Sequence, residues 1–191
     1  MAVGLSRGAW GYSDVVILQT ERLTLSPCTP ADRADFMALE RDPEVMLFLS
    51  GGHPVESEQG DPDSLFLMPR GTEDHLWTAR RKDSGAFVGW FYFGPGQEEN
   101  VAELGYRLRR KEWGQGFASE AASALVDWGF RSGRYDKAIA CTMAVNAGSR
   151  RVLEKIGFRH VRTDFVDWAD AIPGGEQGEV WYEVLRTERP G

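Results

Sequence analysis

Hydrophobic and polar positions alternate in several separate stretches of the chain, and this alternation predicts β-strands. Residues 22–27 (RLTLSP) show the pattern first. Residues 75–81 and 86–93 repeat it on either side of an Asp-Ser-Gly turn, so they predict a β-hairpin. Residues 101–108 (VAELGYRL) predict a further strand. The remaining predicted strands are 137–145, an apolar run expected to be buried on both faces, and 158–168 and 180–186.

Helical spacing of apolar positions appears later in the chain. Residues 117–130 place Ala121, Leu125 and Trp128 on one stripe, which predicts an amphipathic helix. A second predicted helix covers residues 147–156.

Turn and cap residues mark where helices begin and end. Asn146 is an N-cap for the helix at 147–156, and Gly157 stands where a helix-ending glycine belongs. Thr29-Pro30 and Asp42-Pro43 each join an N-cap residue to a first-turn proline. These two pairs predict short helices that reach Glu40 and Leu49.

No internal repeat or linker divides the chain. Residues 1–15 are glycine-rich and unpatterned, so we expect a flexible N-terminal arm. Residues 50–74 are rich in glycine, proline and acidic residues, which predicts a long loop or lid beside a site. The remainder, 16–191, is expected to form a single α+β domain.

Composition narrows the function classes. The net charge of -7 argues against a nucleic-acid binder, which normally carries a basic surface. The two cysteines and three histidines have no metal-ligand spacing, so no metal site is expected, and few cysteines favour the cytoplasm. No apolar stretch approaches the length of a membrane-spanning helix, so no membrane partner is expected.

The stretch KEWGQGFASEA at 111–121 carries the strongest chemical signal. Gly114 and Gly116 stand before a predicted helix, whose first N–H groups lack intrahelical partners and whose dipole adds partial positive charge at that end. Glycines leave no Cβ in the way of a phosphate. Arg109, Arg110 and Lys111 add positive charge at the rim. A tight turn before a packed helix explains the same glycines without a ligand.

Two motifs together resemble a known family. ELGYRLRRKEWGQGFASEA, followed about thirty residues later by VNAGSRRVLEKIGF, resembles the GNAT superfamily of acetyl-CoA-dependent N-acetyltransferases. Lys111, Gly114 and Gly116 match its pyrophosphate loop, R/Q-x-x-G-x-G/A, with Lys as a departure in the first place. The order of QTERLTL, DPEVMLFL and DSGAFVGW resembles the branch containing the ribosomal-protein N-terminal acetyltransferases.

The resemblance implies a fold and a donor site. The fold is a mixed, mostly antiparallel sheet of about six to seven strands, flanked by about four helices. Its fourth and fifth strands splay apart, and here those strands are 101–108 and 137–145. Acetyl-CoA is then expected in the cleft between them. The implied cofactor-binding residues are Leu108, Arg109, Arg110, Lys111, Gly114, Gln115, Gly116, Phe117, Ala118, Asn146 and Ser149.

The resemblance also implies direct transfer to an amine, without a covalent enzyme intermediate. Glu103 matches the position of a general base, although it also fits a solvated or substrate-positioning carboxylate. Asn146 is implied to face the cofactor while capping its helix. Ser149 is implied to help protonate the leaving thiolate, or is a small polar residue of the first turn.

One departure concerns the general acid. Many members carry a tyrosine seven residues after the asparagine, where this chain has Leu153. Ser149 or water would then serve, and the acid stays open. Asp164 and Asp167 are runner-up carboxylates that also fit exposed strand positions. Cys141 is interpreted as a packing residue rather than a nucleophile.

The acceptor is left open between a protein N-terminus, a small-molecule amine and an amine-bearing antibiotic. Aromatic residues at 90, 92, 113 and 168 would line its pocket or pack in the core, and acids at 56, 58, 61 and 63 suit a cationic amine or a solvated loop. A non-catalytic module that binds or senses acyl-CoA is the alternative from another class. Homodimers are common in the family, so a second copy of the chain is a possible partner.

Overall fold

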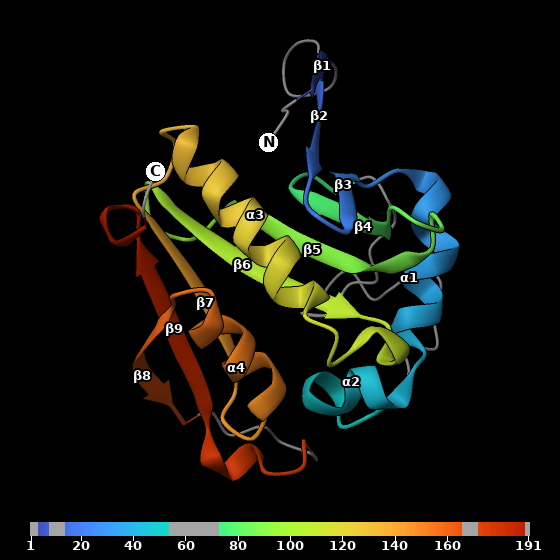
Figure 1. The fold of residues 1–191 in the computed structure, drawn as a ribbon. Coiled ribbons are helices and arrows are strands. Elements are labelled where there is room, and N and C mark those ends of the chain that lie inside the picture. Colours follow the sequence, from blue (N-terminus) through green and yellow to red (C-terminus); the bar gives the residue numbers. More distant parts are fainter. Residues whose placement is uncertain (1–3, 8–13, 54–72, 166–171, 190–191) are drawn as a thin grey trace.

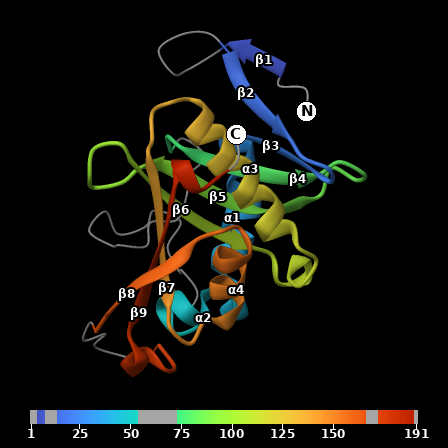
Figure 2. The same cartoon turned by 60° about the vertical axis from the view of Figure 1, so that its left-hand side comes forward.

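The computed structural model describes residues 4–7, 14–53, 73–165 and 172–189. Among them, nine strands form one sheet in the order β1-β2-β3-β4-β5-β6-β7-β9-β8 (Figure 1 and Figure 2). The strands are β1 (Gly4–Arg7), β2 (Asp14–Gln19), β3 (Leu23–Pro27), β4 (Leu76–Arg81), β5 (Phe87–Pro95), β6 (Val101–Leu108), β7 (Lys137–Met143), β8 (Arg159–Asp164) and β9 (Glu179–Leu185). The helices are α1 (Arg33–Glu40), α2 (Pro43–Ser50), α3 (Phe117–Arg131) and α4 (Ala147–Lys155), with short 3₁₀ turns at 30–32, 110–112, 175–177 and 186–188.

The expected α+β class with a mixed, mostly antiparallel sheet is confirmed. Each neighbouring pair of strands is antiparallel except β6 and β7, which run parallel. Parallel strands need a crossover connection, and α3 provides it. The described sheet has more strands than the six to seven expected, because β1 and β2 add a hairpin at its N-terminal edge.

This hairpin lies across the boundary that the sequence placed at residue 15. The segment 1–15 contains β1 and the first residues of β2, and Gly4 stands opposite Ile17 in their antiparallel pairing. The run DVVILQ is rich in β-branched residues, which favour strands and account for β2. The division into an arm (1–15) and a domain (16–191) stays a prediction.

Helix α3 packs one apolar stripe against β5 and β6, as its spacing predicted. Ala121 and Leu125 are fully buried in the core, and burying a leucine contributes about 1.5–3 kcal/mol. Trp128 is partly buried, with its ring edge-on to the Trp77 ring. Gly129 lets the helix approach the sheet closely, because a Cβ there would lie 2.1 Å from the Phe93 ring.

The caps predicted for α4 and α2 are confirmed. Asn146 Oδ1 accepts a hydrogen bond from the Ser149 backbone N–H at 3.1 Å, and Gly157, with φ +90°, follows the end of α4. Asp42 Oδ1 accepts from the Glu44 backbone N–H at 2.9 Å at the start of α2. Local hydrogen bonds thus fix both helix starts.

Strand β7 differs from its prediction. Ala138, Ala140 and Met143 are buried, whereas Ile139 and Cys141 are half-buried. The expectation of burial on both faces is therefore wrong. In the described chain the core cluster that contains α3 and α4 residues covers only the alanine face of β7.

Helix α1 packs on the sheet face opposite to α3. Its Phe36 forms a separate cluster with Leu76 and Phe87, and Trp90 and Tyr92 pack against this cluster. Their neighbours in β5, at positions 91 and 93, face the main core instead. This alternation across β5 is what places helices on both faces of the sheet.

Several expectations concern residues outside the described ranges. These are most of the lid at 50–74 with its acids at 56, 58, 61 and 63, and residues 167 and 168. In the described ranges no helix combines the length and the apolar character needed to cross a bilayer. The cytoplasmic location stays a prediction.

Candidate active site

The two halves of the sheet part between β6 and β7, which confirms the expected splay. Their parallel pairing comprises three residue pairs, which are Val101–Lys137, Ala102–Ala138 and Glu103–Ile139. Beyond them β6 continues along β5 and β7 continues along β9, and these two described stretches are not paired with each other. We call the region between residues 104–108 and 140–143 the splay.

Both helix N-termini lie at the end where the strands part, because α3 follows β6 and α4 follows β7 along the chain (Figure 1). Gly114 and Gly116 precede α3 with φ values of +72° and +83°, a left-handed conformation that favours glycine. The first bond of α3 runs from the Glu120 N–H to the Gly116 carbonyl. The N–H groups of residues 117–119 are therefore the donors that a helix start leaves without intrahelical partners.

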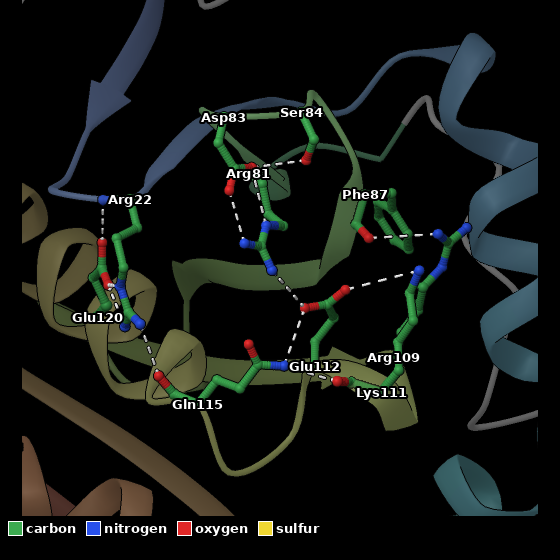
Figure 3. A network of polar contacts seen from close by, with 10 residues as sticks. All are labelled: Arg22, Arg81, Asp83, Ser84, Phe87, Arg109, Lys111, Glu112, Gln115 and Glu120. Atoms are coloured by element: carbon green, nitrogen blue, oxygen red, sulfur yellow. Dashed lines mark hydrogen bonds and ion pairs between the residues drawn. The ribbon is translucent and has the colours of Figure 1, made fainter.

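Arg22, the residue before β3, lies over this helix N-terminus (Figure 3). Its Nη1 donates to the Gln115 carbonyl at 2.9 Å, and its Nη2 lies 2.7 Å from Glu120 Oε2. The guanidinium also stacks on the Phe117 ring at 4.4 Å from the ring centroid. A Cβ on Gly116 would lie 3.4 Å from Arg22 Nη2, so a side chain there would fill the space before the guanidinium.

A groove of about 560 Å³ begins at this point and runs between α3 and the C-terminal end of α4. Its wall includes the cations Arg22, Lys155 and Arg189, the acids Glu120 and Glu188, and Ser119. Arg189 is held by an ion pair to Asp127 at 2.8 Å. Helix-start amides, several cations and an open groove fit a ligand that carries phosphate groups.

The predicted rim cations lie in different places. Arg109 is turned toward α1, where it pairs with Asp35 and stacks on the Phe87 ring. Arg110 pairs with Glu44 at 3.0 Å and stacks on the Trp113 ring, and Lys111 is exposed. The geometry therefore directs the Arg109 and Arg110 side chains toward α1 and α2, away from the amides of α3, and their assignment to the cofactor stays a prediction.

The loop before α3 is held by a buried carboxylate. Glu112 is only 4% exposed and lies 3.6 Å from Arg81 Nη1 (Figure 3). Gln115 Nε2 donates to the Lys111 carbonyl at 2.8 Å and so closes the turn from within. These contacts fix the path that brings both glycines to the start of α3.

Other predicted donor-site residues lie close to the same turn. Leu108 is buried, and its carbonyl accepts a hydrogen bond from Trp113 Nε1 at 2.8 Å. Phe117 is buried beneath Arg22, and Ala118 is partly buried against the core. Phe117 and Ala118 contribute backbone N–H groups at the helix start.

Glu103 occupies the last paired position before the splay. Burial raises the pKa of its carboxyl, and the nearby Glu179 carboxylate raises it further. Glu103 is thereby a stronger proton acceptor than an exposed glutamate. Glu179 lies on β9, opposite Met143 of β7.

Ser149 and Asn146 are brought together by the cap of α4, which places both on the β7 side of the splay. On the β6 side, Tyr106 reaches the same turn. Its hydroxyl donates to the Ser149 carbonyl at 3.2 Å and lies 3.0 Å from Ser149 Oγ. Burial raises the pKa of Tyr106 to about 12.

Three further residues lie as follows. Leu153 is fully buried in the core, so α4 offers an apolar group at that position. Burial and neighbouring carboxylates raise the pKa of Cys141, which keeps it a neutral thiol as a packing role requires. Asp164 pairs with Arg162 at 3.0 Å on β8, away from Glu103's strand.

Sequence reasoning missed Arg22, Lys155, Tyr106 and Glu179. Tyr106 is separated from Ser149 by 43 positions and Arg22 from Glu120 by 98, and neither pair carries a local spacing signal. Tyr106 lies three residues after Glu103 in the motif ELGYRL, and this proximity in the sequence is the signal that could have pointed to it.

Comparison with known proteins identifies the family. Residues 22–159 match the Acetyltransferase (GNAT) domain. The chain is similar to the FsC-acetyl coenzyme A-N(2)-transacetylase of Aspergillus fumigatus, with 34% identity over 90% of this chain and 77% of that protein. The protein belongs to the GNAT acetyltransferase family, and it is accordingly an acyltransferase that uses acetyl-CoA.

Solved structures have the same fold. The GNAT-family acetyltransferase from Bacillus anthracis superposes with a TM-score of 0.70 at 23% identity, covering 90% of this chain and 99% of that one. The spermidine N-acetyltransferase from Vibrio cholerae, solved with CoA and spermine, gives a TM-score of 0.67 at 14% identity and covers 87% and 96% of the two chains. At these identities the likeness establishes the fold.

Proposed function

We propose that the protein transfers the acetyl group of acetyl-CoA directly to the primary amine of a small molecule. The observation that carries this proposal is the position of Glu103, a carboxylate of raised pKa, at the point where β6 and β7 part. An amine acceptor is supported by the relative whose name describes transfer to an N(2) nitrogen. It is supported too by the acceptor spermidine in the name of a protein of the same fold.

The donor end is assigned to the start of α3 and the groove beside it. The N–H groups of residues 117–119 and the Arg22 guanidinium would hold the pyrophosphate, because they offer aimed donors and positive charge together. Gly116 leaves room for this approach. Lys155, on the wall of the same groove, would meet a further phosphate.

The acyl end is assigned to the splay. Substrate amines are protonated at neutral pH, and Glu103 would accept a proton so that the nitrogen can attack the acetyl carbonyl. A C–N bond then forms, the C–S bond breaks and the sulfur leaves as a thiolate, while the nitrogen gives up its second proton, which neutralises the thiolate by way of solvent. Ser149 would donate a hydrogen bond to that sulfur, and Asn146 would keep Ser149 in place by capping α4.

The acceptor end is assigned to the sheet face that carries Glu103. Burial raises the pKa of the half-buried Glu103 carboxyl there, and the charge of the nearby Glu179 carboxylate raises it further. A cationic amine would relieve this repulsion, because it supplies the missing positive charge. Trp90 and Tyr92 lie on alternate positions of β5 and pack toward α1.

A protein N-terminus is the second candidate acceptor. It is favoured by the order of QTERLTL, DPEVMLFL and DSGAFVGW, which resembles the branch containing the ribosomal-protein N-terminal acetyltransferases. An amine-bearing antibiotic is a special case of the small-molecule acceptor. The homodimer stays a prediction that gel filtration with light scattering would test.

The test is identification of the acetylated product. The full chain is incubated with acetyl-CoA and either a mixture of small amines (ornithine, lysine, putrescine, spermidine and an aminoglycoside) or peptides that begin with alanine or serine. Mass spectrometry then reports which compounds gain an acetyl group. We expect acetylation in the small-amine mixture; acetylation of the peptides alone would replace the first candidate by the second.

A further inference from the structure

Tyr106 and Ser149 are in contact across the splay. Tyr106 lies on β6 after the last residue pair with β7, and Ser149 lies in the first turn of α4. The Tyr106 hydroxyl lies 3.0 Å from Ser149 Oγ and 3.2 Å from the Ser149 carbonyl oxygen. The contact thus links β6 to α4 across the splay, in the region where β6 and β7 are not paired with each other.

The hydrogen atoms in this contact can be counted. A phenol has one hydrogen to donate, and a backbone carbonyl can only accept. When Tyr106 donates to the carbonyl, Ser149 Oγ–H is free to donate to the phenol oxygen. When Tyr106 donates to Oγ, the Ser149 hydrogen is free to point elsewhere. The phenol therefore has two acceptors, and its choice between them sets the direction of the Ser149 hydrogen.

We propose that Tyr106 is a positioning residue that orients the Ser149 hydroxyl toward the sulfur of the coenzyme, so that Ser149 stabilises the leaving thiolate. This inference rests on the proposed function. As negative charge forms on the sulfur, the Ser149 hydrogen turns to it, and the Tyr106 hydrogen moves from the carbonyl to Oγ. Tyr106 keeps its proton throughout, and only the acceptor of its hydrogen bond changes.

The acid strength of the phenol fits positioning rather than proton donation. Burial raises the pKa of Tyr106 to about 12. A simple thiol has a pKa of about 8.5, so a thiolate is too weak a base to take the phenolic proton. Tyr106 therefore stays a neutral hydrogen-bond donor, and such donors strengthen a bond to a developing anion.

A purely structural role for the ring is the competing explanation. Tyr106 packs against the core with its ring 5.8 Å from the Phe91 ring. Tyr106→Phe retains that packing and removes only the hydroxyl. Tyr182→Phe is the matched control, because the Tyr182 hydroxyl also binds α4, donating to Glu154 at 2.9 Å and accepting from Arg150 at 3.1 Å.

The test measures how strongly the site prefers a thiolate, with no acceptor needed. Calorimetry gives the Kd of CoA and of desulfo-CoA, which lacks the sulfur, at pH values below and above the thiol pKa. The Kd ratio isolates the sulfur, and its change with pH reports thiolate stabilisation. For the wild-type protein we expect the CoA preference to rise with pH by about three- to tenfold, since one pKa unit corresponds to a tenfold change.

The variants then separate the outcomes. Tyr106→Phe and Ser149→Ala should each remove most of the rise, the double variant should equal Ser149→Ala, and Tyr182→Phe should keep the rise. Additive losses in the double variant, or an equal loss in Tyr182→Phe, would overturn the inference, as would a full rise in Tyr106→Phe. Failure of the wild-type protein to bind either compound would instead defeat the proposed function on which it rests.

Discussion

Arg22 and Glu120 are 98 positions apart, yet Arg22 Nη2 lies 2.7 Å from Glu120 Oε2 at the start of α3. Glu120 also accepts from the Arg22 backbone N–H at 2.8 Å. The carboxylate therefore fixes the guanidinium over the amides to which we assign the pyrophosphate. The turn before β3 is in this way part of the assigned donor site, although the phosphate motif lies about ninety residues further along the chain.

Replacing Arg22 by alanine should weaken acetyl-CoA binding by about tenfold or more, because a charge-assisted hydrogen bond is lost and Glu120 is left facing the anion. Isothermal titration at two salt concentrations measures the loss. The salt dependence of Kd should also decrease, since one cation fewer meets the phosphates. Arg131→Ala, at the exposed far end of α3, is the control. Equal affinities for the two variants would remove Arg22 from the donor site.

Replacing Gly116 by valine should abolish tight acetyl-CoA binding. The φ of +83° costs a valine about 1–2 kcal/mol, and the side chain would fill the space before Arg22. Gly133→Val is matched, because Gly133 has φ +71° and open space around it, beyond the other end of α3. Both variants should lose stability in a thermal melt, but only Gly116→Val should lose affinity. Unchanged affinity in that variant contradicts the phosphate assignment.

Glu103→Gln should lower the turnover rate by about a hundredfold or more, the usual effect of removing a general base. Because the pKa of Glu103 is raised, ionised Glu103 costs folding free energy as pH rises, so this variant should not melt earlier than wild type at neutral pH. A lower melting temperature together with lost activity would point to misfolding instead.

Glu179→Gln tests the same carboxylate through its pH profile. Glu103 must be deprotonated to act, so the rate should fall as pH drops through its raised pKa. Removing the Glu179 charge removes one cause of that raised pKa, and the acid limb should move to lower pH. A kcat/KM profile against pH measures this shift. An unchanged acid limb would contradict the influence of Glu179 on the pKa of Glu103.

Glu40→Ala should destabilise the fold by about 3–5 kcal/mol, because it leaves the buried Arg107 cation without its partner. Trp90 Nε1 also loses an acceptor at 3.1 Å. Glu44→Ala breaks an exposed pair with Arg110 and should cost about 0–1 kcal/mol. Urea unfolding measures the free energy of unfolding of both variants. Similar losses would mean that burial does not determine how much these ion pairs contribute to stability.

The sequence predicted the elements that local chemistry determines. Helix ends are examples, because a cap acts on residues only a few positions away and its pattern can be recognised in a short stretch of sequence. This holds for the N-caps Asn146 and Asp42 and for the helix-ending Gly157. The glycines before α3 belong to this class as well. The mixed sheet and its splay were implied by the family resemblance that the two motifs carry.

The rest depends on contacts between distant segments. The Arg22–Glu120 pair and the Tyr106–Ser149 contact arise only when β3, β6, α3 and α4 are packed together. Proximity in the sequence can also mislead. Arg109 is adjacent to the phosphate motif, yet its side chain forms an ion pair with Asp35 on α1. The sequence shows which charges are present, and packing decides where they point.

The most direct test of the central claim is a thiol-release assay on the full chain with acetyl-CoA and increasing amounts of small primary amines. We predict release that saturates with at least one amine, equals the acetylated product mole for mole, and drops at least about a hundredfold in Glu103→Gln. Tight acetyl-CoA binding with no thiol release from any amine or peptide would contradict it, and would favour a module that senses acyl-CoA.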